Sequence, residues 1–257
     1  MVTLQIEDAT YQVPSRLEEL CKKQLLACVG HLFFPDRPAA QAAVLLTLLP
    51  AAAKKQVRRF TDAQRLDVVR AVTAWMGKPH HTCPITSFRL GLTRYLLPRY
   101  ERISLIETAK AQEALARWQK TQSEDALNLA VATLCRPRRL WLRCFPFARH
   151  YATGWDGDER ERYNAEIVAA RAKRMAGLPL AKKLLVVWHF EGMIATAKRQ
   201  FAGVFAHSAP GSKPAPLIDT VFHLSGTELG DYRAVSHTPL VTVLYLIHTR
   251  LEAAAQQ

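Results

Sequence analysis

Features that would indicate a membrane or secreted protein are missing from this sequence. Its longest apolar stretch, residues 39–53, contains polar residues and a proline, and it falls short of the roughly 20 residues that a membrane-spanning helix needs. The first eight residues lack the basic and apolar segments of a secretory signal. The five cysteines are odd in number and far apart, which is typical of reduced thiols. We therefore expect a soluble cytoplasmic protein with five free cysteines: Cys21, Cys28, Cys83, Cys135 and Cys144.

The motifs of common enzyme classes are also missing. Neither glycine-rich pattern of nucleotide-binding proteins occurs, and the G-x-S-x-G turn of many hydrolases is absent. His80, His81 and Cys83 lie close together, but no second ligand pair stands at the spacing of a tetrahedral zinc site. The acidic run 156–159 lacks EF-hand spacing and is better interpreted as the first turn of a helix. We predict no enzyme, no metal site and no cofactor; an enzyme with an unrecognised site is the third and weakest hypothesis.

Composition and periodicity favour a mainly α-helical fold. Apolar residues make up 49% of the 257 residues, enough for a sizeable core. Alternating residues before Pro14 predict an N-terminal β-hairpin, and residues 87–97 form one further short extended segment. Capping boxes that begin at Ser15 and Thr61 mark two helix starts, and Cys21 and Cys28 lie on the apolar face of the first helix, which Gly30 ends. Further helices are predicted from residue 39 to Pro50, up to Gly77, and at 104–121, 124–134, 159–176, 180–203, 216–226 and 238–255.

The net charge of +13 is concentrated in the middle of the chain. Residues 135–150 contain no acid and five arginines, which are Arg136, Arg138, Arg139, Arg143 and Arg149. Aromatic residues alternate with them, a pattern that can bind a nucleic acid by stacking and charge, or form a linker with solvated arginines. Because residues 136–157 lack periodicity, they are the best boundary between a region 1–135 and a region 158–257, unless the chain forms one domain.

A series of different short motifs follows one another along most of the chain. They are Tyr11 to Pro14 at the end of a hairpin, Phe88 to Pro98 as a second strand, Ile106-Glu107 in a helix, Ala132 to Pro137 as a helix ending in Arg-Pro, Gly157 to Arg160 as an acidic turn, Arg171 to Pro179, and the helix that begins at Thr238. This order resembles a family of tailed-phage proteins from tail gene clusters that includes tail assembly chaperones. The chain departs from the family pattern at residues 21–23 and in its arginine-rich residues 138–150.

The resemblance implies a protein that acts through protein–protein contact. It would be a phage tail assembly factor or chaperone that keeps tape-measure or tail-tube subunits soluble in the cytoplasm of the bacterial host, or a structural protein of the virion. Such a protein needs apolar surfaces for its client, and Trp188 and Leu244 are candidates, although their spacing also suits plain core packing. Arg136, Arg138, Arg139 and Arg143 would border that surface. The alternative is a basic nucleic-acid-binding protein, whose affinity would fall steeply with salt.

Overall fold

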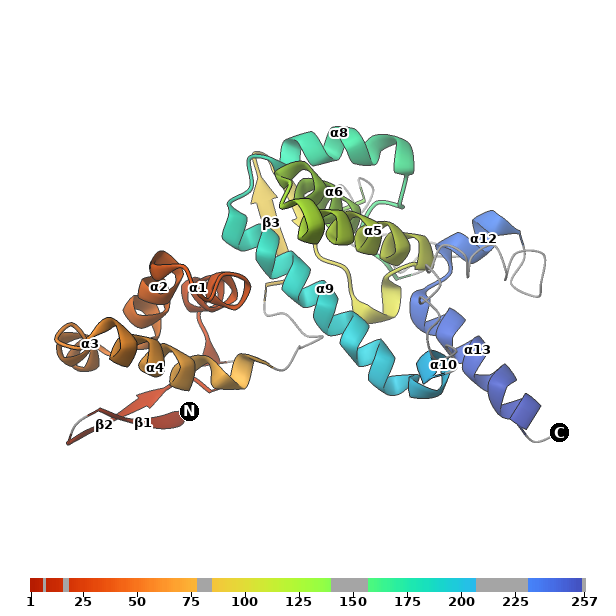
Figure 1. The fold of residues 1–257 in the computed structure, drawn as a ribbon. Helices are drawn as coiled ribbons and strands as arrows, with labels where there is room; N and C mark the ends of the chain where they lie inside the picture. Colours follow the sequence, from red (N-terminus) through yellow and green to blue (C-terminus); the bar gives the residue numbers. More distant parts are fainter. Residues whose placement is uncertain (7, 16–18, 78–84, 140–156, 207–230, 256–257) are drawn as a thin grey trace. The chain divides into compact units, whose positions relative to one another are not determined.

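The computed structural model describes residues 1–6, 8–15, 19–77, 85–139, 157–206 and 231–255, and these are predominantly α-helical (Figure 1). The predicted mainly α fold with an N-terminal β-hairpin is confirmed. Two compact units are present: Met1–Ile85 with Leu180–Glu191, and Thr86–Pro179 with Gly192–Gln257. Among the helices described, none is long and apolar enough to cross a lipid bilayer. The helix predicted at 216–226 and the cluster at residues 80–83 lie outside the described residues.

The first unit begins with an antiparallel hairpin in which Val2 pairs with Val13 and Ile6 with Ala9. Its elements are β1 (Val2–Ile6), β2 (Ala9–Val13), α1 (Lys22–Phe33), α2 (Pro38–Leu48), α3 (Ala51–Val57), α4 (Asp62–Thr73) and the short 3-10 helix η2 (Ala74–Gly77). Helix α1 packs against α2, and α4 packs against α2 and β1. The predicted capping box at Thr61 starts α4, because the Thr61 hydroxyl accepts a hydrogen bond from the backbone N–H of Gln64.

The sequence-based boundaries of the first helix are wrong at both ends. Helix α1 begins at Lys22, with Cys21 as N-cap and the Gln24 side chain accepting a hydrogen bond from the Cys21 backbone N–H. Cys21 is therefore exposed rather than part of the core, whereas Cys28 is fully buried. Gly30 does not end α1, because packing against α2 offsets the roughly 1 kcal/mol that a glycine costs inside a helix. A further helix, α3, follows Pro50, where only a helix end had been predicted.

The second unit carries a three-stranded antiparallel sheet of order β3-β4-β5. Its strands are β3 (Ser87–Leu90), β4 (Thr93–Leu96) and β5 (Arg136–Pro137). The single extended segment predicted over 87–97 is therefore a hairpin, which turns at Gly91 with a φ of +58°. Because only glycine adopts this left-handed backbone without strain, Gly91 allows the chain to reverse, and Leu92 at the tip is almost fully exposed.

The other regular elements described in the second unit are helices. They are η3 (Tyr100–Arg102), α5 (Leu105–Thr121), α6 (Glu124–Leu134), α8 (Ala165–Met175), α10 (Ala202–Ala206), α12 (Tyr232–His237) and α13 (Leu240–Ala255). Helix α9 (Leu180–Gln200) contributes residues to both units. Helix α5 packs on α6, and α6 packs on α8. The bounds of α5 and α6 agree with the helices predicted at 104–121 and 124–134.

The predicted boundary segment 136–157 does not coincide with the division between the units. Both of its ends belong to the second unit, where the Arg139 N–H donates to the Glu159 carbonyl and the Glu161 N–H donates to the Pro137 carbonyl. The helix expected from residue 159 begins only at Ala165, with Asn164 as its N-cap. The acidic run therefore does not start a helix; its described members pair with the arginine run instead.

Candidate functional site

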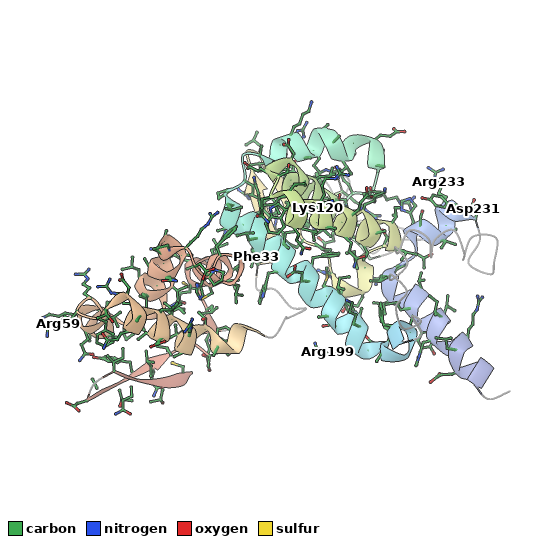
Figure 2. The ribbon with its side chains drawn as sticks, viewed as in Figure 1. Phe33, Arg59, Lys120, Arg199, Asp231 and Arg233 are labelled. Carbon is green, nitrogen blue, oxygen red and sulfur yellow. The ribbon has the colours of Figure 1, made fainter. Side chains whose placement is uncertain are left out.

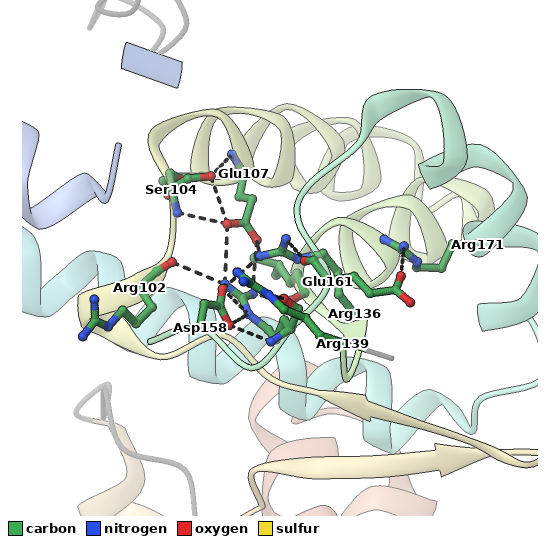
Figure 3. Close-up of polar contacts among 11 residues, drawn as sticks. Arg102, Ser104, Glu107, Arg136, Arg139, Asp158, Glu161 and Arg171 are labelled. Carbon is green, nitrogen blue, oxygen red and sulfur yellow. Dashed lines mark hydrogen bonds and ion pairs between the residues drawn. The ribbon is translucent and has the colours of Figure 1, made fainter. Parts of the chain in front are cut away.

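The most unusual feature of the described residues is a group of charged side chains inside the second unit (Figure 3). Four residues form this buried ion cluster: Glu107, Arg136, Asp158 and Arg160. Glu107 is 1% exposed, and Arg136 and Arg160 are each 2% exposed. The Asp158 side chain is 15% exposed. Two carboxylates face two guanidiniums, so the charges of the four side chains cancel.

Helix α5 positions Glu107 through its own capping box. The Ser104 hydroxyl accepts a hydrogen bond from the Glu107 backbone N–H at 3.4 Å, and the Ser104 backbone N–H donates to Glu107 Oε2 at 3.0 Å. This use of Oε2 holds the carboxylate at the first turn of α5 and directs Oε1 toward the arginines. Oε1 lies 2.6 Å from Arg136 Nη2 and 3.1 Å from Arg160 Nη1. One carboxylate therefore both caps a helix and pairs with two cations.

Arg160 lies at the centre of the cluster and uses all three of its nitrogens. Its Nε and Nη2 bind the Asp158 carboxylate at 3.0 and 2.8 Å, which is the side-on pairing that a planar guanidinium favours. Its Nη1 also donates to the carbonyl of Leu134 at 2.9 Å, which is one of the last carbonyls of α6 and has no partner within the helix. Arg160 thereby links the N-terminus of α5, the C-terminus of α6 and the acidic turn.

Arg136 enters the cluster from the short strand β5. The pairing of Leu96 with Arg136 places β5 beside β4, next to the end of α6. The Arg136 guanidinium contacts Glu107, reaches Asp158 Oδ2 at 3.3 Å, and donates from Nη1 to the carbonyl of Glu161. Strand β5 is thus fixed by backbone pairing on one side and by ion pairs on the other.

Two outer ion pairs and one hydrogen bond extend the cluster toward the surface. Arg138 Nε contacts Glu159 Oε2 at 3.0 Å, Arg139 Nε donates to the carbonyl of Arg160 at 2.8 Å, and Arg171 Nη2 contacts Glu161 Oε2 at 3.3 Å. The arginine run and the acidic turn therefore lie antiparallel, more than 20 residues apart in the chain, and are joined by ion pairs and by hydrogen bonds to backbone carbonyls.

Three members of the cluster, Asp158, Arg160 and Arg136, have shifted pKa values. Burial raises the pKa of Asp158, but the charges and hydrogen bonds of Arg160 and the charge of Arg136 outweigh it, so the net pKa is lowered. Burial lowers the pKa of Arg160, and the charges of Glu107 and Asp158 more than reverse this. Burial, opposed by Glu107, lowers the pKa of Arg136 to about 10. All three groups remain ionised near pH 7, so these side chains act as fixed charges that join chain segments.

The structure places the predicted partner-binding residues as follows. Arg136 is buried in the cluster and offers no surface to a partner, which corrects its prediction as an exposed contact. Arg138 and Arg139 are half-buried and bound to the acidic turn. Trp188 and Leu244 are 4% and 2% exposed, so they belong to the core and not to an open groove. Arg143 lies outside the described residues.

The sequence pattern did not indicate that the acidic half of the cluster pairs with the arginines. The Ser104-x-x-Glu107 pattern is a capping box that could have been read from the sequence, and Asp158 to Glu161 is the nearest acidic segment after the arginine run.

Metal ligands do not form part of the site: in the part of the chain that the structure describes, no group of three or more His, Cys, Asp or Glu residues could hold a metal ion. No protein-family model, curated protein or solved structure matches this chain.

Proposed function

We propose that this chain is a tailed-phage assembly factor that works by protein–protein contact and keeps a tail protein, the tape-measure or tail-tube subunit, soluble before assembly. The observation that supports the proposal is the composition of the buried ion cluster. The motifs that carry the family resemblance, Ile106-Glu107, Ala132 to Pro137 and Gly157 to Arg160, supply its four residues. Short motifs that resemble one family separately thus meet in one place in this fold.

The cluster supports a scaffold role for these motifs. Its carboxylates are occupied by guanidiniums, and its guanidiniums by carboxylates and backbone carbonyls, so their chemistry serves to hold α5, α6 and β5 together.

The alternative of nucleic-acid binding depends on the arginine-rich run 135–150. Of its arginines, Arg136 is buried, and Arg138 and Arg139 bind Glu159 and the Arg160 carbonyl, so these three give it little support. The remaining two, Arg143 and Arg149, lie outside the described residues. Charge reversal at Arg138 and Arg139 is also a poor test of partner binding, because it would place acids against the acidic turn.

The test is co-expression with the tail proteins encoded beside this gene. The tape-measure protein and the tail-tube subunit are each produced with this chain, with an empty vector, and with an unrelated basic helical protein of similar size as the matched control. We expect one of the two tail proteins to become soluble, and to copurify, only with this chain. If neither tail protein is kept soluble, the assembly-factor proposal is wrong. Mass spectrometry of purified particles separates the remaining roles, because a virion structural protein would be retained at stoichiometric levels.

A further inference from the structure

Four arginines lie side by side across the sheet of the second unit and the acidic turn next to it. Arg89 on β3 pairs directly with Arg94 on β4. The backbone N–H of Arg138 donates to the carbonyl of Arg94 at 3.4 Å, and Arg138 forms an antiparallel bridge with Arg160. Because residues that pair directly across antiparallel strands have their side chains on the same face, these four arginines form one cross-strand row.

Acidic partners are present at one end of the cross-strand row and missing at the other. Arg160 binds two carboxylates of the buried ion cluster, and Arg138 binds one, that of Glu159, at 3.0 Å. Among the residues that the structure describes, no acid pairs with Arg94 or Arg89, and both of these arginines are exposed. The fold itself therefore shows which group the row binds, and two of the four positions lack that group.

The unpaired end of the row holds two cations at close range. Because the Arg94 carbonyl points toward β5, its pair with Arg89 has no backbone hydrogen bonds, and in such pairs the Cα atoms are only about 4.5 Å apart. Like charges at such positions are destabilising. Phe88 and Tyr95 fix them there, since these rings stack 5.6 Å apart on the buried face. Arg94 Nε also donates to the Ser87 hydroxyl at 3.0 Å, which holds the guanidinium against the sheet and leaves its Nη groups for a partner.

We propose that Arg89 and Arg94 bind the acidic face of a helix in a partner protein, so that carboxylates from the partner continue the acidic series along the row. The inference deepens the proposed function and rests on it for the partner's identity, which would be the tail protein held soluble. Arginine suits this role better than lysine, because a planar guanidinium binds a carboxylate through two parallel hydrogen bonds.

The spacing of the row favours a helix as the partner element. Acids at positions i and i+4 of a helix lie about 5–6 Å apart. Paired residues of neighbouring antiparallel strands have a similar separation, about 4.5–5.5 Å. Side chains on one side of an extended segment are wider apart, at about 6.6 Å. Leu92, which is 98% exposed at the tip of the same hairpin, adds an apolar contact beside the row.

A nucleic acid fits this face less well than an acidic helix. The aromatic side chains of the three strands, Phe88 and Tyr95, are both buried on the opposite face, so the row offers no platform on which bases could stack. Glu159 lies beside the row and would repel a phosphate backbone that extends past the two unpaired arginines. A second copy of this chain would bring a net charge of +13 against its own.

The experiment measures binding of two fluorescein-labelled peptides to the full chain by fluorescence anisotropy at low salt. Both are alanine-rich helical peptides of the same composition and net charge. The first has its glutamates at i, i+4 spacing on one face, and the second has them distributed around the helix. The row variant is Arg89→Gln with Arg94→Gln. Its matched control, Arg199→Gln with Arg233→Gln, removes the same charge from exposed arginines of the same unit, which Figure 2 shows at the end of α9 and on α12.

We expect the one-face peptide to bind the unaltered chain at least about 5-fold more tightly than its isomer. The row variant should weaken that binding by at least about 10-fold, whereas the control should stay within about 2-fold. Equal losses in both variants, or equal binding of both peptides, would overturn the inference, because net charge alone would then explain the binding. A DNA oligonucleotide of the same charge that binds more tightly than the peptide, and depends on the row, would also overturn it.

A second measurement tests whether the chain itself covers the row. Phenylglyoxal, which reacts with accessible guanidiniums, should label Arg89 and Arg94 in the folded chain and spare Arg136 and Arg160, as read by peptide mass spectrometry. The one-face peptide should then protect the first two. Protection before the peptide is added would overturn the inference, because another part of the chain would already occupy the row. Co-expression separates the two proposals: peptide binding without rescue of a tail protein refutes only the proposed function, whereas rescue that is unaffected by the row variant refutes only this surface.

Discussion

Neutralising Glu107 tests whether the buried ion cluster stabilises the second unit. Glu107→Gln removes one negative charge and leaves Arg136 and Arg160 facing Asp158 alone, so the buried group acquires a net charge of +1. Glutamine can still accept the hydrogen bond from the Ser104 backbone, because capping boxes use Glu or Gln. The variant therefore isolates the charge. Leaving a buried ion without its partner costs about 3–5 kcal/mol, which is a large share of the roughly 5–15 kcal/mol that stabilises a typical domain.

Glu113→Gln is the matched control, since it makes the same chemical change on the same helix. Glu113 pairs with Lys110 at 2.9 Å, but its side chain is 56% exposed. Such a surface pair contributes at most about 1 kcal/mol. The assay is unfolding in urea, monitored by hydrogen exchange of peptides from α5 and α6, so that the stability of the second unit is measured separately. Urea is used because guanidinium salts screen ion pairs. If Glu107→Gln loses no more stability than Glu113→Gln, the cluster does not hold this unit together.

Two further predictions follow from the described side chains. The pKa of Asp158 is lowered in the fold, since the arginine charges outweigh the raising effect of burial; its pairing therefore stabilises the fold above the unfolded pKa of about 4 and this contribution is lost as the pH falls through the lower folded value. We expect the free energy of unfolding to decrease over that acidic range, and the decrease to be smaller in Asp158→Asn; an unchanged pH profile in the variant would contradict the pairing. Cys28 is buried, and burial raises the pKa of its thiol to about 12 although a backbone hydrogen bond acts in the opposite direction. Cys21 is exposed. Iodoacetamide at pH 8 should therefore label Cys21 and spare Cys28 until the protein is unfolded, as read by peptide mass spectrometry, and equal labelling of both in the folded protein would show that the first helix is placed wrongly.

The helices were predictable where their causes are local. Ser104 and Glu107 supply the cap of α5, and the apolar spacing continues to Trp118 in its last turn, so nothing outside the segment is needed to define it. The same applies to Thr61 at the start of α4. Prediction failed at α1, which begins after Cys21 and continues through Gly30, because its packing against α2 is not visible in the sequence.

The candidate site was only half predictable because its cause is not local. The sequence shows an arginine run and, separately, an acidic turn, and each has a sound local interpretation as a solvated face or a helix start. Their pairing depends on β5 lying beside β4 and on α6 ending close to Glu107. Complementary charges more than 20 residues apart become evidence only when the fold brings them together. The burial of Arg136 is the clearest case, because nothing within its own segment distinguishes it from Arg138.

The number of backbone carbonyls at the cluster explains why arginine occupies its centre. The ends of α6 and η3 and the irregular residues before α8 meet there, and their carbonyls need donors: those of Leu134 and Arg102 accept from Arg160, that of Glu161 from Arg136, and that of Arg160 from Arg139. A leucine or methionine could fill the same volume, and apolar replacement of a simple buried ion pair is often tolerated. Here it would also leave these carbonyls unpaired, at a cost of about 1–3 kcal/mol each if they stay buried. A guanidinium with five donors satisfies carboxylates and carbonyls together, so in this cluster charge pairing and backbone satisfaction require the same residue type.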